Sequence, residues 1–316
     1  MRSWAVLFPG QGSQHVGMGA ELAAAHPQAR AVFERADAAL DQPLSRLCWE
    51  GPESELVETQ NAQPAILVHS YAVWSMLEEK LGGGVRFAAG HSLGEFTAYA
   101  AAGSLDLESA VRLVRRRGEL MAESRQGTMS ALIGLADEVV DGICETVRSE
   151  AGTVVPANYN SPGQVVISGE VEAVERAEAM ARERGARMVR RLTVSGAFHS
   201  PLMASAELGL QEALESVGFR HPRFPVISNV TAEPVSEAAT ARATLVQQLT
   251  APVRWTEGIR YMAAQGAGTY LELGPGKVLT GLLRRIDSNL EGRAINGPPD
   301  TETLDEGGES GGREGE

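Results

Sequence analysis

The stretch at residues 85–103 constrains the fold most, because an apolar run leads directly into a glycine-flanked serine and then into a helical pattern. "VRFAAG" (85–90) indicates a buried strand, and "GHSLGE" (90–95) matches the pattern G-x-S-x-G. The glycines permit a tight turn that leaves the serine hydroxyl accessible between strand and helix. The sequence therefore predicts an α/β fold with Ser92 as candidate nucleophile. A serine at an ordinary strand–helix turn is the alternative.

Strand and helix patterns alternate around this turn. "WAVLF" (4–8) reads as a buried strand that feeds a glycine-rich loop. Residues 64–81 read as a helix, with Pro64 at the favoured first helical position. Asp106 is a typical N-cap for the next helix, at about 107–124. This alternation favours a parallel sheet covered by helices.

The middle of the chain follows another order. Strand and helix patterns there give the sequence β-α-β-β-α-β, at residues 129–136, 137–151, 153–160, 163–169, 171–185 and 186–195. This order is the ferredoxin-like plan. We expect a small subdomain at 127–196, inserted into a larger one formed by 1–126 and 197–296. The chain re-enters the larger part through apolar runs at 224–230 and 269–276.

The composition fits an ordinary globular enzyme. The chain has 316 residues, of which 43% are hydrophobic and 22% are charged. Cys48 and Cys144 stand far apart without metal-ligand spacing, so we expect free thiols in a reducing compartment and no metal. No apolar stretch is long enough to span a membrane, and the N-terminus lacks the pattern of a signal peptide. A cytoplasmic location is the expectation.

The net charge of −13 is partly local. Residues 300–316 carry seven acids and one arginine, and we expect 297–316 to be a disordered acidic tail. The remaining body is also acidic, which argues against general nucleic-acid binding.

A nucleophilic serine needs a base, and six histidines are candidates. Among them, His199 in "SGAFHSPLM" follows a predicted strand, in the loop between the subdomains. It is the best candidate by position, although a structural role in that loop is the alternative. His15, in the glycine-rich loop, stays open as a second candidate. The other four are less suitable, because His91 flanks the serine, His26 and His221 each precede a proline, and His69 lies in a helix.

The loop "PGQGSQHVGMG" does not complete a nucleotide-binding motif. His15 stands where G-x-G-x-x-G needs glycine, and Met18 follows Gly17 where a phosphate loop needs lysine. Its glycines more plausibly bring backbone amides to a reacting centre. We expect the amides of Gln11 and Leu93 to form an oxyanion hole, although an ordinary glycine-rich turn is the alternative.

Three consecutive arginines lie on the helix at 107–124. At about 100° per residue, Arg117 falls in the middle of the apolar face, whereas Arg115 and Arg116 fall on the wet side. A buried guanidinium needs an anion. Periodicity leaves two choices open, a structural ion pair with a protein carboxylate or a substrate carboxylate held beside Ser92.

The chain resembles malonyl-CoA:acyl-carrier-protein transacylases, a family of fatty acid and polyketide synthesis. The motifs that carry the resemblance lie in the family's order and cover almost everything except the acidic tail. They are "FPGQGSQ" (8–14), "TQNAQPAI" (59–66), "GHSLGE" (90–95), "RRGELM" (116–121), "NYNSPGQVVISG" (158–169), "AFHSPLM" (197–203), "QQLTAPVRW" (247–255) and "ELGPGKVL" (272–279).

The resemblance implies an α/β-hydrolase-like large subdomain, a ferredoxin-like small one and a malonyl-serine intermediate at Ser92. It implies that His199 is the base, oriented by a backbone carbonyl at the position matched by Gln248, and that Arg117 binds the malonyl carboxylate. Further implied substrate-binding residues are Gln63, Met121, Phe198 and Asn160. The substrate would be a coenzyme A thioester and the partner an acyl carrier protein. We expect no bound cofactor and no metal, no nucleic acid or membrane partner, and a monomer.

Two details concern the acyl group and the pathway. In related polyketide acyltransferases, phenylalanine before the histidine and an aliphatic residue after the serine accompany malonyl, and here these are Phe198 and Leu93. Phe198 also inclines the chain toward the polyketide type, so the pathway stays open. A hydrolase, a non-catalytic carrier-binding module and a discrete polyketide acyltransferase are the competing functions. Candidate basic patches for a carrier are Arg112, Arg115 and Arg116, or Arg182, Arg184, Arg187, Arg190 and Arg191.

Overall fold

The computed structural model describes residues 3–124, 126–298 and 300. Its larger sheet has the strand order β10-β9-β1-β2-β7-β8, and every pair in it is parallel except β7–β8. The strands are β1 (Trp4–Phe8), β2 (Val85–Gly90), β7 (Val226–Ile227), β8 (Pro234–Val235), β9 (Thr269–Leu273) and β10 (Glu291–Ile295). The predicted α/β class is confirmed. The sequence patterns did not identify β8 and β10.

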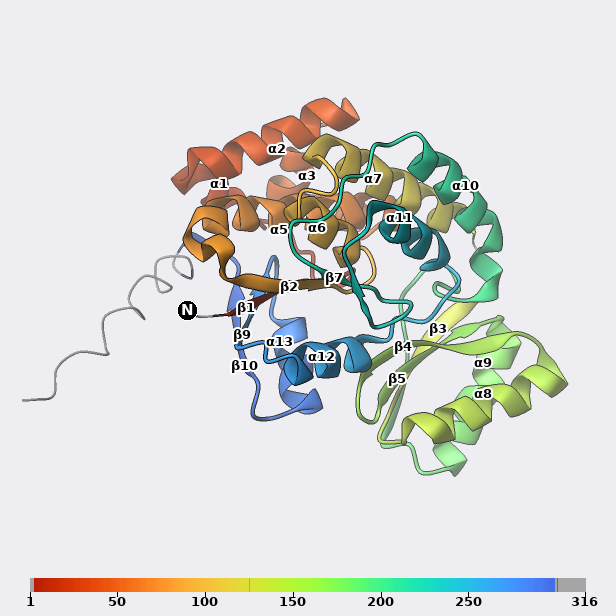
Figure 1. The fold of residues 1–316 in the computed structure, drawn as a ribbon. Coiled ribbons are helices and arrows are strands. Elements are labelled where there is room, and N and C mark those ends of the chain that lie inside the picture. Colours follow the sequence, from red (N-terminus) through yellow and green to blue (C-terminus); the bar gives the residue numbers. More distant parts are fainter. Residues whose placement is uncertain (1–2, 125, 299, 301–316) are drawn as a thin grey trace, which may run out of the picture.

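Helices cover both faces of this sheet (Figure 1). Along β1, Val6 and Phe8 face one apolar core, whereas Ala5 and Leu7 face another, as the two-residue period of a strand requires. The first core lies under α1 (Ala20–Ala25), α2 (Pro27–Leu40), α3 (Leu44–Glu50), α4 (Glu53–Leu56), α5 (Thr59–Leu81), α6 (Gly94–Ala101), α7 (Leu107–Glu123), α10 (Ala204–Glu215) and α11 (Ala238–Gln247). The second lies under α12 (Trp255–Ala264) and α13 (Val278–Ile286).

The middle of the chain forms a separate antiparallel sheet beside the first (Figure 1). Its order is β4-β5-β3-β6, from β3 (Thr128–Ile133), β4 (Val154–Ser161), β5 (Gln164–Gly169) and β6 (Met188–Arg191). With α8 (Asp137–Ala151) and α9 (Val171–Glu183) it gives the predicted β-α-β-β-α-β plan. One face packs on α8 and α9, while Met129 and Val166 join the core of the large part. The boundaries at 127 and 197 remain our proposal.

The predicted start of the helix at Pro64 is wrong. Helix α5 begins at Thr59, so Pro64 lies inside it. Proline lacks the N–H that would bond the carbonyl of Gln60 four residues earlier. In the structure Arg115 Nη1 donates to that carbonyl at 2.9 Å and so replaces the missing donor. A side chain from another helix therefore makes the interior proline tolerable.

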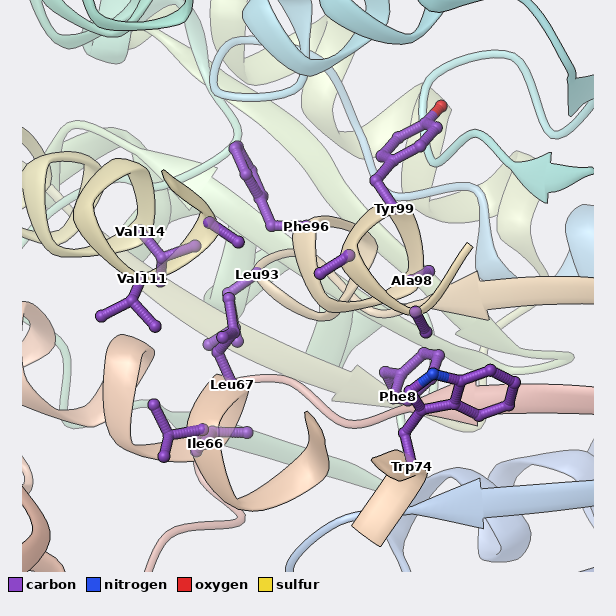
Figure 2. Close-up of a cluster of buried hydrophobic side chains, with 14 of the residues drawn as sticks. Phe8, Ile66, Leu67, Trp74, Leu93, Phe96, Ala98, Tyr99, Val111 and Val114 are labelled. Atoms are coloured by element: carbon purple, nitrogen blue, oxygen red, sulfur yellow. The ribbon is translucent and has the colours of Figure 1, made fainter. Parts of the chain in front are cut away.

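Helix α6 is buried along its whole length, between β1 and the helices α5 and α7. Figure 2 shows Leu93 and Phe96 among side chains of α5 and α7, and Trp74 beside Phe8 and Ala98. A Cβ on Gly94 would lie 2.2 Å from the carbonyl oxygen of Phe8. The turn before α6 can therefore approach β1 only with glycine at this position.

Two further expectations concern the C-terminal tail and membrane-spanning helices. The predicted acidic tail at 297–316 lies almost entirely outside the described residues. Among the described helices, none combines the length and the apolar character that crossing a bilayer requires.

Candidate active site

The candidate site lies at the carboxyl ends of β1, β2 and β7, where open α/β sheets usually bind ligands. Ser92 follows β2 and has a left-handed backbone (φ 53°), which is unusual for a residue with a side chain. A Cβ on Gly90 would lie 1.8 Å from the carbonyl carbon of Gly94, so both glycines are sterically required. The N–H of Ser92 donates to Asn229 Oδ1 at 2.8 Å, which fixes the turn after β7 against it.

His199 is the histidine that the fold brings to the serine. It precedes the short helix η2 (Pro201–Met203), is 3% exposed, and its Nε2 lies 2.8 Å from Ser92 Oγ. Its Nδ1 faces the carbonyl oxygens of Gln248 at 2.9 Å and Ala251 at 3.2 Å. Because only a protonated Nδ1 can bond to carbonyls, Nε2 is left as an acceptor for the serine proton. This is the geometry of a general base.

The environment of His199 keeps the imidazole neutral. Burial lowers its pKa to about 3, with Arg117 contributing, while the carbonyl of Gln248 opposes the shift. At neutral pH the ring can therefore accept a proton. His91, which flanks the serine, turns away and its Nε2 lies 2.8 Å from Asn160 Oδ1.

Arg117 points inward from α7, as the helical period predicts, and is 1% exposed. Its guanidinium donates to Gln63 Oε1 at 2.7 Å, Ser92 Oγ at 3.0 Å and Gln248 Oε1 at 2.9 Å. These partners are all neutral. Among the described residues no carboxylate bonds directly to Arg117, and the carboxylate that acts on it through space is Glu95.

The expectation that Arg115 is wet is only partly right. Its guanidinium is half-buried and bonds to the carbonyl of Gln60, to Asn61 Oδ1 at 2.6 Å and to Gln42 Oε1. Helix α7 approaches α5 closely here, because a Cβ on Gly118 would lie 2.7 Å from the Cα of Gln60. The helical period correctly placed Arg115 away from the apolar face of α7, but it could not show that α5 lies against this side. Arg116 is exposed as expected.

The other predicted site residues lie around this centre. Leu93 is the N-cap residue of α6. Among the described residues, neither the amide of Leu93 nor that of Gln11 donates a hydrogen bond. Both amides therefore remain candidates for an oxyanion hole. Gln63 Nε2 donates to the sulfur of Met121 at 3.2 Å, which aims Gln63 Oε1 at Arg117. Phe198, next to His199, is buried.

Two residues of the network escaped the sequence analysis. Glu95, on the first turn of α6, accepts from Gln248 Nε2 at 2.6 Å and from the N–H of Asn229 at 3.1 Å. Asn229 Nδ2 donates to the carbonyl of Gly90 at 2.8 Å. An acid in a first helical turn reads as a dipole partner at the surface, which hides this role. The position of Asn229 after a parallel strand was the only available clue.

This fold and geometry define a class of enzyme that forms an ester on an activated serine. The chain belongs to the acyl transferase family, because the model of the acyl transferase domain matches residues 5–294. It is 44% identical over 301 residues to the malonyl CoA-acyl carrier protein transacylase of Bacillus subtilis, covering 94% of this chain and 95% of that protein. The Escherichia coli K12 protein of the same name is also 44% identical, with 94% and 97% covered.

Solved structures show the same likeness. The malonyl CoA-acyl carrier protein transacylase of Coxiella burnetii superposes with a TM-score of 0.93 at 40% identity, covering 96% of each chain. A malonyl-transacylase in complex with a type II polyketide synthase acyl-carrier protein superposes with a TM-score of 0.93 at 44% identity, covering 96% of this chain and 99% of that one.

Proposed function

We propose that this protein transfers a malonyl group from malonyl-CoA to the phosphopantetheine thiol of an acyl carrier protein. The observation that carries the proposal is Arg117, a buried cation whose Nη2 lies 3.0 Å from Ser92 Oγ and whose bonded partners are neutral. A buried guanidinium that bonds directly to no carboxylate is costly unless a ligand supplies one. The free carboxylate of a malonyl group meets this need while its thioester carbon lies at Ser92.

In the first half-reaction, Ser92 Oγ attacks the thioester carbon and its proton passes to His199 Nε2, which lies 2.8 Å away. The new bond is Oγ–C, and the broken bond is C–S. His199 then gives the proton to the leaving sulfur, which releases coenzyme A as a thiol. The amides of Gln11 and Leu93 stabilise the negative oxygen formed in between.

In the second half-reaction the carrier thiol attacks the malonyl ester. His199 takes the thiol proton and returns it to Ser92 Oγ as the C–O bond breaks. The carbonyl of Gln248, 2.9 Å from Nδ1, stabilises the charged imidazole in both steps. The carrier protein seen with a similar malonyl-transacylase supports this acceptor.

Selection among acyl groups follows from the same residues. Arg117 favours a charged acyl group, and Gln63 and Met121 hold the guanidinium of Arg117 in place. The family resemblance also assigns Asn160 to substrate binding, and its Oδ1 lies 2.8 Å from His91 Nε2. We propose that the buried ring of Phe198 fills the space that an α-methyl group would need. One methyl group gives a discrimination of about 1–3 kcal/mol.

A second candidate is the same chemistry in polyketide synthesis, as a discrete acyltransferase. Two observations favour it: Phe198 before the base, and the likeness to a transacylase bound to a polyketide carrier protein. A serine hydrolase and a non-catalytic module fit less well, because a water nucleophile needs no buried cation and a binding module needs no Ser92–His199 contact.

The setting of the reaction belongs to the proposal as well. We propose a monomer as the catalytic unit. Cys48 and Cys144 are free and buried, in keeping with a cytoplasmic enzyme. The substrate is a coenzyme A thioester, and the mechanism requires no bound cofactor.

The test uses malonyl-CoA labelled in the acyl group. Incubated alone, the protein should retain one covalent label, and Ser92→Ala should retain none. Added carrier protein should receive the label and discharge the enzyme. Loss of label to water at the same rate with and without carrier would refute transfer, and a protein that takes no label would refute acylation.

A further inference from the structure

Glu95 is a buried carboxyl group that the proposed mechanism leaves without a task. It is 0% exposed, and its Oε2 accepts from Gln248 Nε2 at 2.6 Å and from the N–H of Asn229 at 3.1 Å. Its Oε1 finds no hydrogen-bond partner in the part of the chain that the structure describes. Burying a carboxyl group with one unsatisfied oxygen costs stability, so its place beside the reacting centre requires an explanation.

The side chain of Gln248 connects Glu95 to Arg117. Its Oε1 accepts from Arg117 Nη2 at 2.9 Å, while its Nε2 donates to Glu95. The amide dipole is thus aligned between a cation and a carboxyl group. Glu95 attracts the guanidinium across one amide without occupying its donors, and none of the described residues accepts a hydrogen bond from Arg117 Nε.

The other ionisable groups around Glu95 are neutral. They come from the end of β2, from the loop before η2 and from the next turn of α6. Burial lowers the pKa of His91, lowers that of His199 to about 3, and raises that of Tyr99 well above its ordinary value. Arg117 from α7 is therefore the only described cation that faces this carboxyl group.

A malonyl carboxylate on Arg117 would be the second carboxylate around one buried guanidinium. Two carboxylates that share a site cannot both ionise freely, and one of them binds a proton. In the empty site, burial raises the pKa of Glu95 to about 7, opposed by Gln248, Asn229 and the charge of Arg117. An additional negative charge raises this pKa further, and Oε1 is free to carry the proton.

We propose that Glu95 is the counter-charge of Arg117 in the empty site and takes up a proton from solvent when a malonyl carboxylate occupies Arg117. This inference rests on the proposed function. Glu95 acts through Gln248 and is a positioning residue, because its Oε2 keeps both bonds in either state. Because Glu95 takes up a proton when the malonyl carboxylate binds Arg117, the net charge of the site is the same in the empty and the occupied state.

The experiment measures proton uptake with an indicator dye in weak buffer, with the intact mass of the protein read from the same sample. At about pH 8, above the pKa in the empty site, forming the malonyl ester should take up as much as one proton. At about pH 6 Glu95 is already protonated, so uptake should vanish. Glu95→Gln, whose amide oxygen can accept both bonds, should form the ester without this uptake.

Equal proton uptake by wild type and Glu95→Gln, with the ester formed in both, would overturn the inference and leave the proposed function standing. Absence of the malonyl ester in wild type would overturn both. The release of coenzyme A contributes equally to the two proteins and cancels in the comparison.

The coupling between malonyl binding and protonation of Glu95 also predicts how the KM for malonyl-CoA depends on pH. Above about pH 7 the apparent KM of wild type for malonyl-CoA should rise, by at most about tenfold per pH unit, while kcat changes less. The profile of Glu95→Gln should be flat. Glu178→Gln is the matched control, since Glu178 is a buried glutamate of α9 bonded to Arg191. A profile of Glu95→Gln as steep as that of wild type would contradict the assignment.

Discussion

Two arginines in the two parts of this molecule, Arg191 on a strand of the small sheet and Arg117 on helix α7, meet opposite surroundings. Arg191, on β6 of the small sheet, is 36% exposed and pairs with Glu178 at 2.9 Å and Glu175 at 3.5 Å. Arg117, beside the large sheet, is 1% exposed and donates only to neutral groups. The cation that water could stabilise bonds to two carboxylates, and the cation that water cannot reach bonds directly to none.

This difference separates a structural charge from a functional one. Screened surface pairs contribute little, so evolution can place or lose them at small cost. A buried guanidinium is expensive and persists where a ligand repays the cost. Arg117 is also within hydrogen-bond distance of the nucleophile, which connects its unfilled donors to the acyl group on Ser92.

The largest effect is expected at the centre of the buried region. His199→Ala removes the proton acceptor 2.8 Å from Ser92 Oγ, and the rate of acyl-enzyme formation should fall by about 10²–10⁴-fold. Rapid-quench measurement with labelled malonyl-CoA gives this rate. A fall of less than tenfold in a folded variant would show that another group accepts the proton.

A smaller effect is expected at Arg115, which lies two residues before Arg117 on α7. Arg115→Ala leaves the carbonyl of Gln60 without the donor that replaces the N–H missing at Pro64. The free energy of unfolding should fall by about 1–3 kcal/mol, the cost of an unsatisfied buried acceptor. Denaturant unfolding measures it, with the exposed Arg112→Ala as control. Equal stability of the two variants would contradict this role.

The exposed arginines of the small subdomain should affect only the binding of the carrier protein. Arg184, Arg187 and Arg190 form no salt bridge among the described residues, whereas Arg182 and Arg191 pair with Glu178. Arg190→Glu should raise the KM for carrier protein by as much as about tenfold and leave that for malonyl-CoA unchanged. If reversal at Arg190 leaves the carrier KM unchanged, the patch on the Arg112 side becomes the candidate.

The smallest effect is expected for the paired surface cation. Glu175→Ala, which removes the exposed partner of Arg191, should lower the free energy of unfolding by less than about 1 kcal/mol and leave acyl transfer unchanged. Thermal unfolding and the transfer assay measure the two quantities. A loss of several kcal/mol would mean that this pair is not an ordinary surface pair.

The sequence predicted the strand, turn and helix around Ser92, the element order of the small part and the inward direction of Arg117, because these follow from local periodicity. It could not exclude a protein carboxylate as partner of Arg117, since that depends on which helices meet α7. The start of α5 was misplaced for the same reason. An interior proline is expensive by local rules, and only the contact with Arg115 shows how the cost is reduced.

The site itself was predicted in part. The histidine beside Ser92 could be chosen by position among six, but its bond to the carbonyl of Gln248 joins residues 49 positions apart. Glu95 and Asn229 were missed because both lie outside the G-x-S-x-G pattern itself, and a single polar residue at a helix start or after a strand carries no local sign of its partners. Their roles appear only when β2, α6 and β7 are assembled.

The most direct test of the central claim compares malonyl-CoA with acetyl-CoA in Arg117→Ala, with Arg191→Ala as control. If Arg117 binds the free carboxylate, kcat/KM for malonyl-CoA should fall by about 10²-fold, the value of one lost charge-assisted contact, and that for acetyl-CoA by much less. The control should leave both values unchanged. An equal fall for the two substrates would contradict the claim, because it would mean that Arg117 acts only on Ser92 and not on the free carboxylate.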